Sequence, residues 1–171
     1  MPGNPTLAAV DTNVLLDLAL PRDVVHDAIS LMRRRLAGGC VFAVLPAVLE
    51  ELRHIQEADS GPAGTLARHT LETLLRDRTF QPVDFTSVGY DIIECAAGRI
   101  LDARLLPSAE RHDAEITAQA ALADCQILLT SDNHLLDIPP DRLRLLLRAQ
   151  DMGCPIIVSP QKVVRDFFPR R

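Results

Sequence analysis

The chain has 171 residues, of which 47% are hydrophobic, and its 18 basic and 23 acidic side chains give a net charge of −5. This size and composition predict one soluble globular domain. The negative charge argues against a protein that binds nucleic acid by bulk electrostatics alone. No apolar stretch reaches the roughly 20 residues of a membrane helix, and residues 1–5 lack the features of a signal peptide. We therefore expect a cytoplasmic protein without membrane contact.

Short apolar runs alternate with helical patterns along the whole chain. Strands are predicted at residues 7–10, 41–45, 126–130 and 156–158. Helices are predicted at residues 14–20, 24–37, 46–57, 65–75, 88–103, 114–123, 141–149 and 161–167, while residues 80–85 fit either a strand or an extended loop. Because short strands separated by helices need crossover connections, the pattern predicts one α/β domain, a three-layer α/β/α sandwich around a mainly parallel sheet.

Cysteines and histidines give no zinc signature. The cysteines are widely separated and are expected to be buried small hydrophobic residues: Cys40, Cys95, Cys125 and Cys154. The five histidines include no pair at i and i+4 with the intervening Glu of a zinc-protease helix. Walker A and Gly-x-Gly-x-x-Gly loops are also absent from the sequence, which argues against P-loop and dinucleotide chemistry.

Two acids stand at the ends of predicted strands. Asp11 comes after the strand at 7–10, and Asp132 comes just after the strand at 126–130. In open α/β sheets, ligands bind beyond the carboxyl ends of the strands, and a buried unpaired charge is costly. A shared cation is the functional interpretation, whereas a helix cap for Asp11 and a turn for Asp132 are the structural ones.

Helical periodicity adds two further acids. In the helix that starts at Pro46, Glu51 lies beside the apolar face and Glu50 lies almost opposite that face. Asp113 stands at the start of a helix rich in small residues, which can pack closely and carry this side chain inward. Alternatively, Glu51 is a solvated helix residue and Asp113 is an N-cap. Glu115 points elsewhere on the same helix and remains an outer candidate.

A cluster of these four acids would have a clear electrostatic consequence. Two like charges about 4 Å apart repel by roughly 4 kcal/mol at an effective dielectric of 20. The cluster would therefore take up protons or bind a divalent cation. Ligation by oxygen alone favours Mg²⁺ or Mn²⁺, ions that activate water and stabilise charge on a phosphate. Phosphodiester hydrolysis is the matching chemistry.

Four segments together form a recognisable pattern: Val10-Asp11-Thr12-Asn13-Val14-Leu15-Leu16, Val48-Leu49-Glu50-Glu51-Leu52, residues 113–122, and residues 128–136 with Thr130-Ser131-Asp132-Asn133. In these segments the chain resembles the PIN-domain ribonucleases, the family that includes the VapC-type toxins of bacterial toxin–antitoxin pairs. The resemblance implies a single PIN-like nuclease domain over residues 1–171. Relative to a compact member, the chain has a longer helical middle section at about 60–111 and a C-terminal extension at about 138–171.

The resemblance also assigns residues and partners. It implies that Mg²⁺ or Mn²⁺ is bound by Asp11, Glu51, Asp113 and Asp132, which would also position the hydrolytic water. Thr130 would bond to a metal-site carboxylate or the substrate phosphate, and Asn13 would orient Asp11. The implied activity is metal-dependent cleavage of RNA, as a toxin restrained by a cognate antitoxin and with a second copy of the chain as dimer partner. A PIN-type nuclease of RNA processing and a catalytically silent RNA- or protein-binding scaffold are the alternatives.

Overall fold

The computed structural model describes residues 5–20, 24–35, 39–72, 76 and 80–167. Within these residues, a single sheet has the strand order β3-β2-β1-β4-β5, and all of its neighbouring strands are parallel. The strands are β1 (Thr6–Val10), β2 (Cys40–Val44), β3 (Phe80–Pro82), β4 (Ile127–Leu129) and β5 (Ile156–Val158). The predicted parallel sheet is confirmed.

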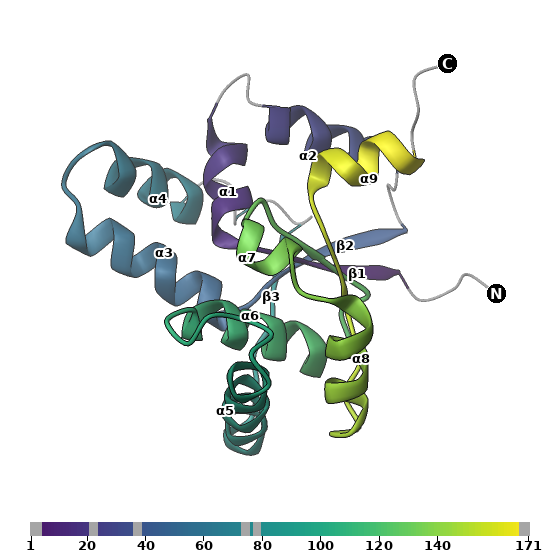
Figure 1. Cartoon of the computed structure of the whole chain (residues 1–171). Coiled ribbons are helices and arrows are strands. Elements are labelled where there is room, and N and C mark those ends of the chain that lie inside the picture. Colours follow the sequence, from purple (N-terminus) through teal and green to yellow (C-terminus); the bar gives the residue numbers. More distant parts are fainter. Residues whose placement is uncertain (1–4, 21–23, 36–38, 73–75, 77–79, 168–171) are drawn as a thin grey trace.

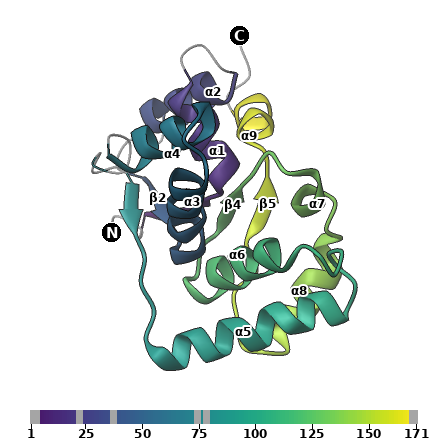
Figure 2. The same cartoon turned by 90° about the vertical axis from the view of Figure 1, so that its left-hand side faces the viewer.

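Helices cover both faces of the sheet, as Figures 1 and 2 show. They are α1 (Thr12–Ala19), α2 (Val24–Arg35), α3 (Pro46–Ala58), α4 (Pro62–Glu72), α5 (Ser87–Asp102), α6 (Arg111–Leu122), α7 (Asn133–Leu136), α8 (Pro140–Arg148) and α9 (Pro160–Phe167). In Figure 2, α1, α2, α4 and α9 lie on one side of the sheet, and α5, α6 and α8 lie on the other. The α/β/α sandwich expected from the sequence is therefore confirmed.

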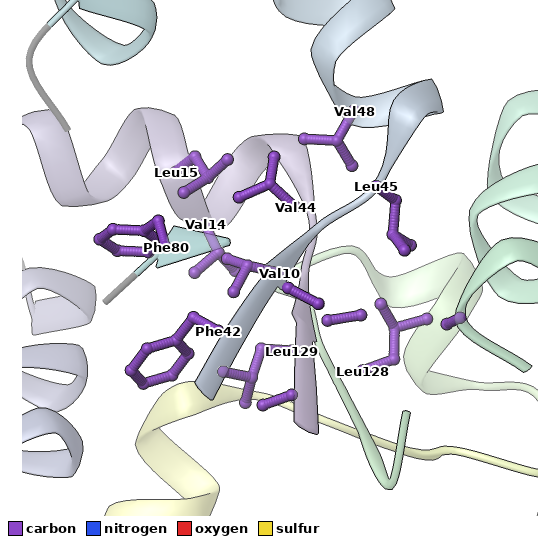
Figure 3. Close-up of a cluster of buried hydrophobic side chains, with 14 of the residues drawn as sticks. Val10, Val14, Leu15, Phe42, Val44, Leu45, Val48, Phe80, Leu128 and Leu129 are labelled. Carbon is purple, nitrogen blue, oxygen red and sulfur yellow. The ribbon is translucent and has the colours of Figure 1, made fainter. Parts of the chain in front are cut away.

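The larger hydrophobic core surrounds the central strands. Ala8, Ala9 and Val10 of β1 are at most 1% exposed, because β1 is covered by helices on both faces and by a strand on each edge. Figure 3 shows side chains of β2 and β4, including Phe42 and Leu129, packed together with side chains from α1 and α3. A second cluster joins α5, α6 and α8 beneath the sheet. The first cluster includes residues of both α3 and α6, and α6 also contributes to the second cluster.

Most element boundaries lie within a few residues of the prediction, and a few elements differ. The first three residues of the ambiguous segment at 80–85 form the edge strand β3, and residues 83–85 lie outside this strand. The short helix α7 has no counterpart in the prediction, because four residues are too few for helical periodicity to be seen. The predicted ends of two helices, at residues 36–37 and 73–75, lie outside the described residues.

One expectation about the cysteines was wrong. Cys95 is exposed, and Cys154 is only partly buried, whereas Cys40 and Cys125 are buried as expected. Cys95 is exposed because it lies on the side of α5 opposite to Ile93, Ala96 and Ala97, which face the second cluster. In the described part of the chain, no helix combines the length and apolar character needed to cross a bilayer.

Candidate active site

The carboxyl ends of three neighbouring strands bring the predicted acids into one region. β1 pairs with β2 on one side and with β4 on the other. Asp11 follows β1, α3 with Glu51 follows β2, and Asp132 comes three residues after the end of β4. The helix α6, which carries Asp113, packs beside α3. Four segments that are distant in sequence therefore meet at the position where open parallel sheets bind ligands.

Asp11 is the buried centre of this region, with only 4% of its surface exposed. Its Oδ1 accepts a hydrogen bond from the backbone N–H of Thr12 at 2.7 Å, and its Oδ2 accepts one from Thr130 Oγ1, also at 2.7 Å. Burial raises the pKa of Asp11 although both hydrogen bonds act in the opposite direction. Asp11 does act as the N-cap of α1. An N-cap residue can lie at an exposed helix end, so the cap role alone does not explain why this carboxylate is buried.

Hydrogen bonds around Thr130 fix the loop that carries Asp132. The Oγ1 atom of Thr130 donates to Asp11 and accepts from the backbone N–H of Asp132 at 2.9 Å. Asn13 was expected to orient Asp11, but its Oδ1 instead accepts from the backbone N–H of Ser131 at 3.2 Å. Asn13 therefore ties the start of α1 to the loop after β4. These contacts set the position of Asp132 relative to Asp11.

Asp132 also caps the short helix α7. Its Oδ1 accepts from the backbone N–H of His134 at 2.6 Å. The turn interpretation of Asp132 is thus correct as far as local structure is concerned. A carboxylate has two oxygens with about four acceptor positions, so capping leaves capacity for a cation.

Glu51 and Glu50 separate as helical periodicity predicts. Glu50 is exposed, whereas Glu51 is partly buried and its Oε2 lies 2.7 Å from Nε2 of His112. Burial would raise the pKa of Glu51, but the hydrogen bond from His112 and contributions from Thr12 and His54 together lower it. The same hydrogen bond, followed by the charges of Glu51, Asp11 and Asp113, raises the pKa of His112 against the effect of its burial. Both partners therefore favour their charged forms.

Asp113 is the least satisfied acid of the region. It lies in the first turn of α6, whose N-cap residue is Glu110, so the N-cap interpretation of Asp113 is wrong. Its buried Oδ2 has no hydrogen-bond partner among the described residues. Burial first, and then the negative charges of Asp132, Asp11 and Glu110, raise the pKa of Asp113 to about 6. The charge of His112 acts in the opposite direction, but it does not offset the burial and the three negative charges.

These contacts and charges provide a test of whether the residues suit a divalent cation. Asp113 interacts electrostatically with Asp132 and Asp11, and Asp11 interacts in the same way with Glu51. Among the described residues, no three acidic, histidine or cysteine side chains are arranged closely enough to hold an ion as they stand. Mutual repulsion keeps clustered carboxylates apart. The donor chemistry, all carboxylate oxygens with one buried and without a partner among the described residues, fits Mg²⁺ or Mn²⁺. The acids do not form a closed coordination site as they stand.

Two buried polar residues of this region gave no sequence signal of their own. Gln119 is fully buried in α6, where its Oε1 accepts from the backbone N–H of Ala47 at 3.0 Å and its Nε2 donates to Glu115 Oε1 at 3.2 Å. The hydroxyl of Thr12 is also buried, and its interaction with Glu51 lowers the pKa of that carboxyl, although among the described residues no hydrogen bond of ordinary geometry reaches this hydroxyl. Gln119 therefore joins α6 to the first turn of α3, the helix that carries Glu51, and it gives Glu115 a structural role.

Comparison with solved structures identifies the fold. A chain in the crystal structure of VapBC2 from Rickettsia felis, bound to a DNA fragment from its promoter, superposes with a TM-score of 0.62 over 90% of this chain and 98% of that chain. The chain has a PIN-like fold of the VapC type. At 16% sequence identity, the likeness concerns the fold alone. The PIN-like architecture expected from the sequence is confirmed.

A second solved structure is less similar. A chain of FitAB bound to an IR36 DNA fragment gives a TM-score of 0.49 at 15% identity, covering 90% of this chain and 94% of that chain. No family model and no curated protein sequence matches the chain.

The hydrogen bonds of Gln119 lead to a prediction for stability. Gln119→Met keeps a similar volume but leaves the buried N–H of Ala47 without its acceptor, so the free energy of unfolding should fall by about 1–3 kcal/mol. Urea denaturation measures the change. Gln81→Met, at an exposed position of β3, is the control and should change stability by less than about 0.5 kcal/mol. Equal midpoints for the two variants would contradict the structural role of Gln119.

The raised pKa of Asp113 leads to a prediction for pH dependence in EDTA. A carboxyl whose pKa is higher in the folded than in the unfolded protein destabilises the fold when it is ionised. Compared with Asp113→Asn, the wild type should lose no free energy of unfolding below about pH 3.8. The loss should grow between about pH 3.8 and 6 and reach its full size above about pH 6. Chemical denaturation across this range measures the difference. Asp91→Asn, on the exposed side of α5, should run parallel to the wild type; the same parallel behaviour in Asp113→Asn would disprove the prediction.

Proposed function

We propose that this chain is a Mg²⁺- or Mn²⁺-dependent endoribonuclease. One observation carries the proposal: acids from four separate segments meet around the buried Asp11, and one of them, Asp113, has a buried oxygen without a partner. Such an arrangement is costly unless a cation joins it. The PIN-like fold supports phosphodiester hydrolysis as the reaction, and the resemblance to PIN-domain ribonucleases supports RNA as the substrate.

In this proposal the cation is held by Asp11, Glu51, Asp113 and Asp132. When bound, it would lower the pKa of a coordinated water and stabilise charge on the scissile phosphate. The residues around the acids keep them in place. Thr130 fixes Oδ2 of Asp11, the N–H of His134 fixes Oδ1 of Asp132, and Gln119 holds the first turn of α3. Binding, rather than direct proton transfer by the protein, is thus the main task of the acids.

We further propose that the chain is the toxin of a toxin–antitoxin pair. The similar fold in VapBC2, a complex bound to its promoter DNA, supports an antitoxin protein as the partner of this chain. A second copy of the chain is the other expected partner. The net charge of −5 gives the surface little general attraction for nucleic acid, so promoter binding in such a complex would fall mainly to the antitoxin.

The first prediction from this proposal concerns activity. With Mg²⁺ or Mn²⁺, the protein should cleave single-stranded or loop RNA, and Asp11→Asn and Asp132→Asn should each lower the rate by about 100-fold or more, since several kcal/mol of charge stabilisation depend on the metal. Gel analysis of end-labelled RNA measures cleavage. Glu50→Gln, next to Glu51 but exposed, is the matched control and should retain the wild-type rate. Wild-type rates in both Asp variants would refute the nuclease assignment, and RNA binding without turnover would favour a silent scaffold.

The second prediction concerns metal binding without substrate. A cation that relieves repulsion among the acids stabilises the folded state, so Mg²⁺ at ten times its Kd should raise the melting temperature by about 3–6 °C relative to EDTA. Differential scanning calorimetry measures the shift. Asp113→Asn should reduce the shift, because it removes the least satisfied ligand. Identical melting temperatures of the wild type in EDTA and in millimolar Mg²⁺ and Mn²⁺ would exclude the proposed metal site.

A further inference from the structure

His112 forms a short hydrogen bond with Glu51. Its Nε2 lies 2.7 Å from Oε2 of Glu51, across 61 positions of sequence and between two helices, α3 and α6. The two helices lie side by side near the carboxyl ends of the strands (Figures 1 and 2). The side chains of His112 and Glu51 keep 39% and 36% of their surface exposed. The pair therefore stands at the solvent-facing side of the acidic region.

The direction of this hydrogen bond follows from the chemistry of the two groups. An ionised carboxylate can only accept, so Nε2 of His112 donates to Oε2 of Glu51. A Glu side chain has several rotatable bonds and loses entropy when it is fixed. A short bond to an imidazole on the neighbouring helix limits the positions that this half-exposed carboxylate can occupy. One donated bond uses only part of the acceptor capacity of Glu51.

We propose that His112 is a positioning residue that holds the Glu51 carboxylate in place for a divalent cation. The inference rests on the proposed function, because it assumes that Glu51 is a metal ligand. Hydrogen bonds to metal ligands commonly account for 10–100-fold in metal affinity. His112 acts through Glu51 and is adjacent in sequence to Asp113, so it connects two of the four acids.

The opposite arrangement makes a distinct prediction. If the imidazole instead occupied the place of the cation, its removal would free Glu51 and increase metal affinity. The two arrangements therefore differ in the sign of the effect. Metal affinity, measured without substrate, separates them.

The experiment compares the wild type with His112→Met and His112→Gln. Met and Gln have the same length, but only Gln carries an amide nitrogen at about the position of Nε2, so only Gln can restore the hydrogen bond to Glu51. Mn²⁺ is the probe, and its binding is followed by the loss of the free-ion electron paramagnetic resonance signal. His112→Met should bind Mn²⁺ about 10-fold or more weakly, and His112→Gln should recover most of that loss.

A second histidine near Glu51 provides a matched control. His54 lies three positions further along α3, is exposed, and affects Glu51 through its charge. Because His54 acts on Glu51 through charge and not through a hydrogen bond that fixes the carboxylate, His54→Ala should change Mn²⁺ affinity much less than His112→Met. Melting temperatures in EDTA establish that each variant is folded; if His112→Met does not fold, His112→Asn takes its place, since its shorter amide does not reach Glu51.

The outcomes distinguish this inference from the proposed function. Wild-type binding of Mn²⁺ with a loss in His112→Met and recovery in His112→Gln supports the positioning role. Equal or tighter binding by His112→Met, while the wild type binds, overturns the positioning role and leaves the metal site intact. Failure of the wild type to bind millimolar Mn²⁺ overturns the metal site and the positioning role together.

Discussion

A carboxylate buried at the end of the central strand is the constraint on which this site depends. Asp11 is held by a backbone N–H and by the hydroxyl of Thr130, yet its burial still opposes its charge. The parallel pairing of β1 with β4 places Thr130 where it can reach Asp11. The sheet therefore supplies both the buried acid and the donor that makes its burial tolerable.

The helices α3 and α6 carry two of the other acids, Glu51 and Asp113, and are themselves fixed by polar contacts. Gln119 joins α6 to the start of α3, and His112 joins α6 to Glu51. Such cross-links between helices are directional, unlike the hydrophobic contacts of the core, so they can set side-chain positions more closely than packing alone. The least restrained acid is Asp113, whose unpartnered oxygen lies among negative charges. Hydrogen bonds thus hold the elements that carry the acids in place, while negative charge predominates around Asp113.

The alternative interpretations of the acids fared differently in the structure. Asp11 and Asp132 are both helix caps as well as candidate ligands, because the residue after a strand is often the residue before a helix in an α/β fold. Asp113 is not the N-cap of its helix, since α6 begins earlier than helical periodicity indicated. The side chain of Asn13 accepts a hydrogen bond from the loop after β4, at the N–H of Ser131. Local sequence patterns identify polar residues at chain reversals, but the contact partner depends on which loops the sheet brings together.

The sequence by itself determined the α/β class, the parallel sheet and the inward side of the helix with Glu51, because these follow from the spacing of apolar residues along the chain. It also predicted which four acids form the candidate site, Asp11, Glu51, Asp113 and Asp132. Only the tertiary structure decided that His112 faces Glu51 and that Gln119 accepts from Ala47. These partners lie 61 and 72 positions apart. A local sequence pattern cannot predict contacts between residues so far apart in the chain, because these contacts form only when α3 packs against α6.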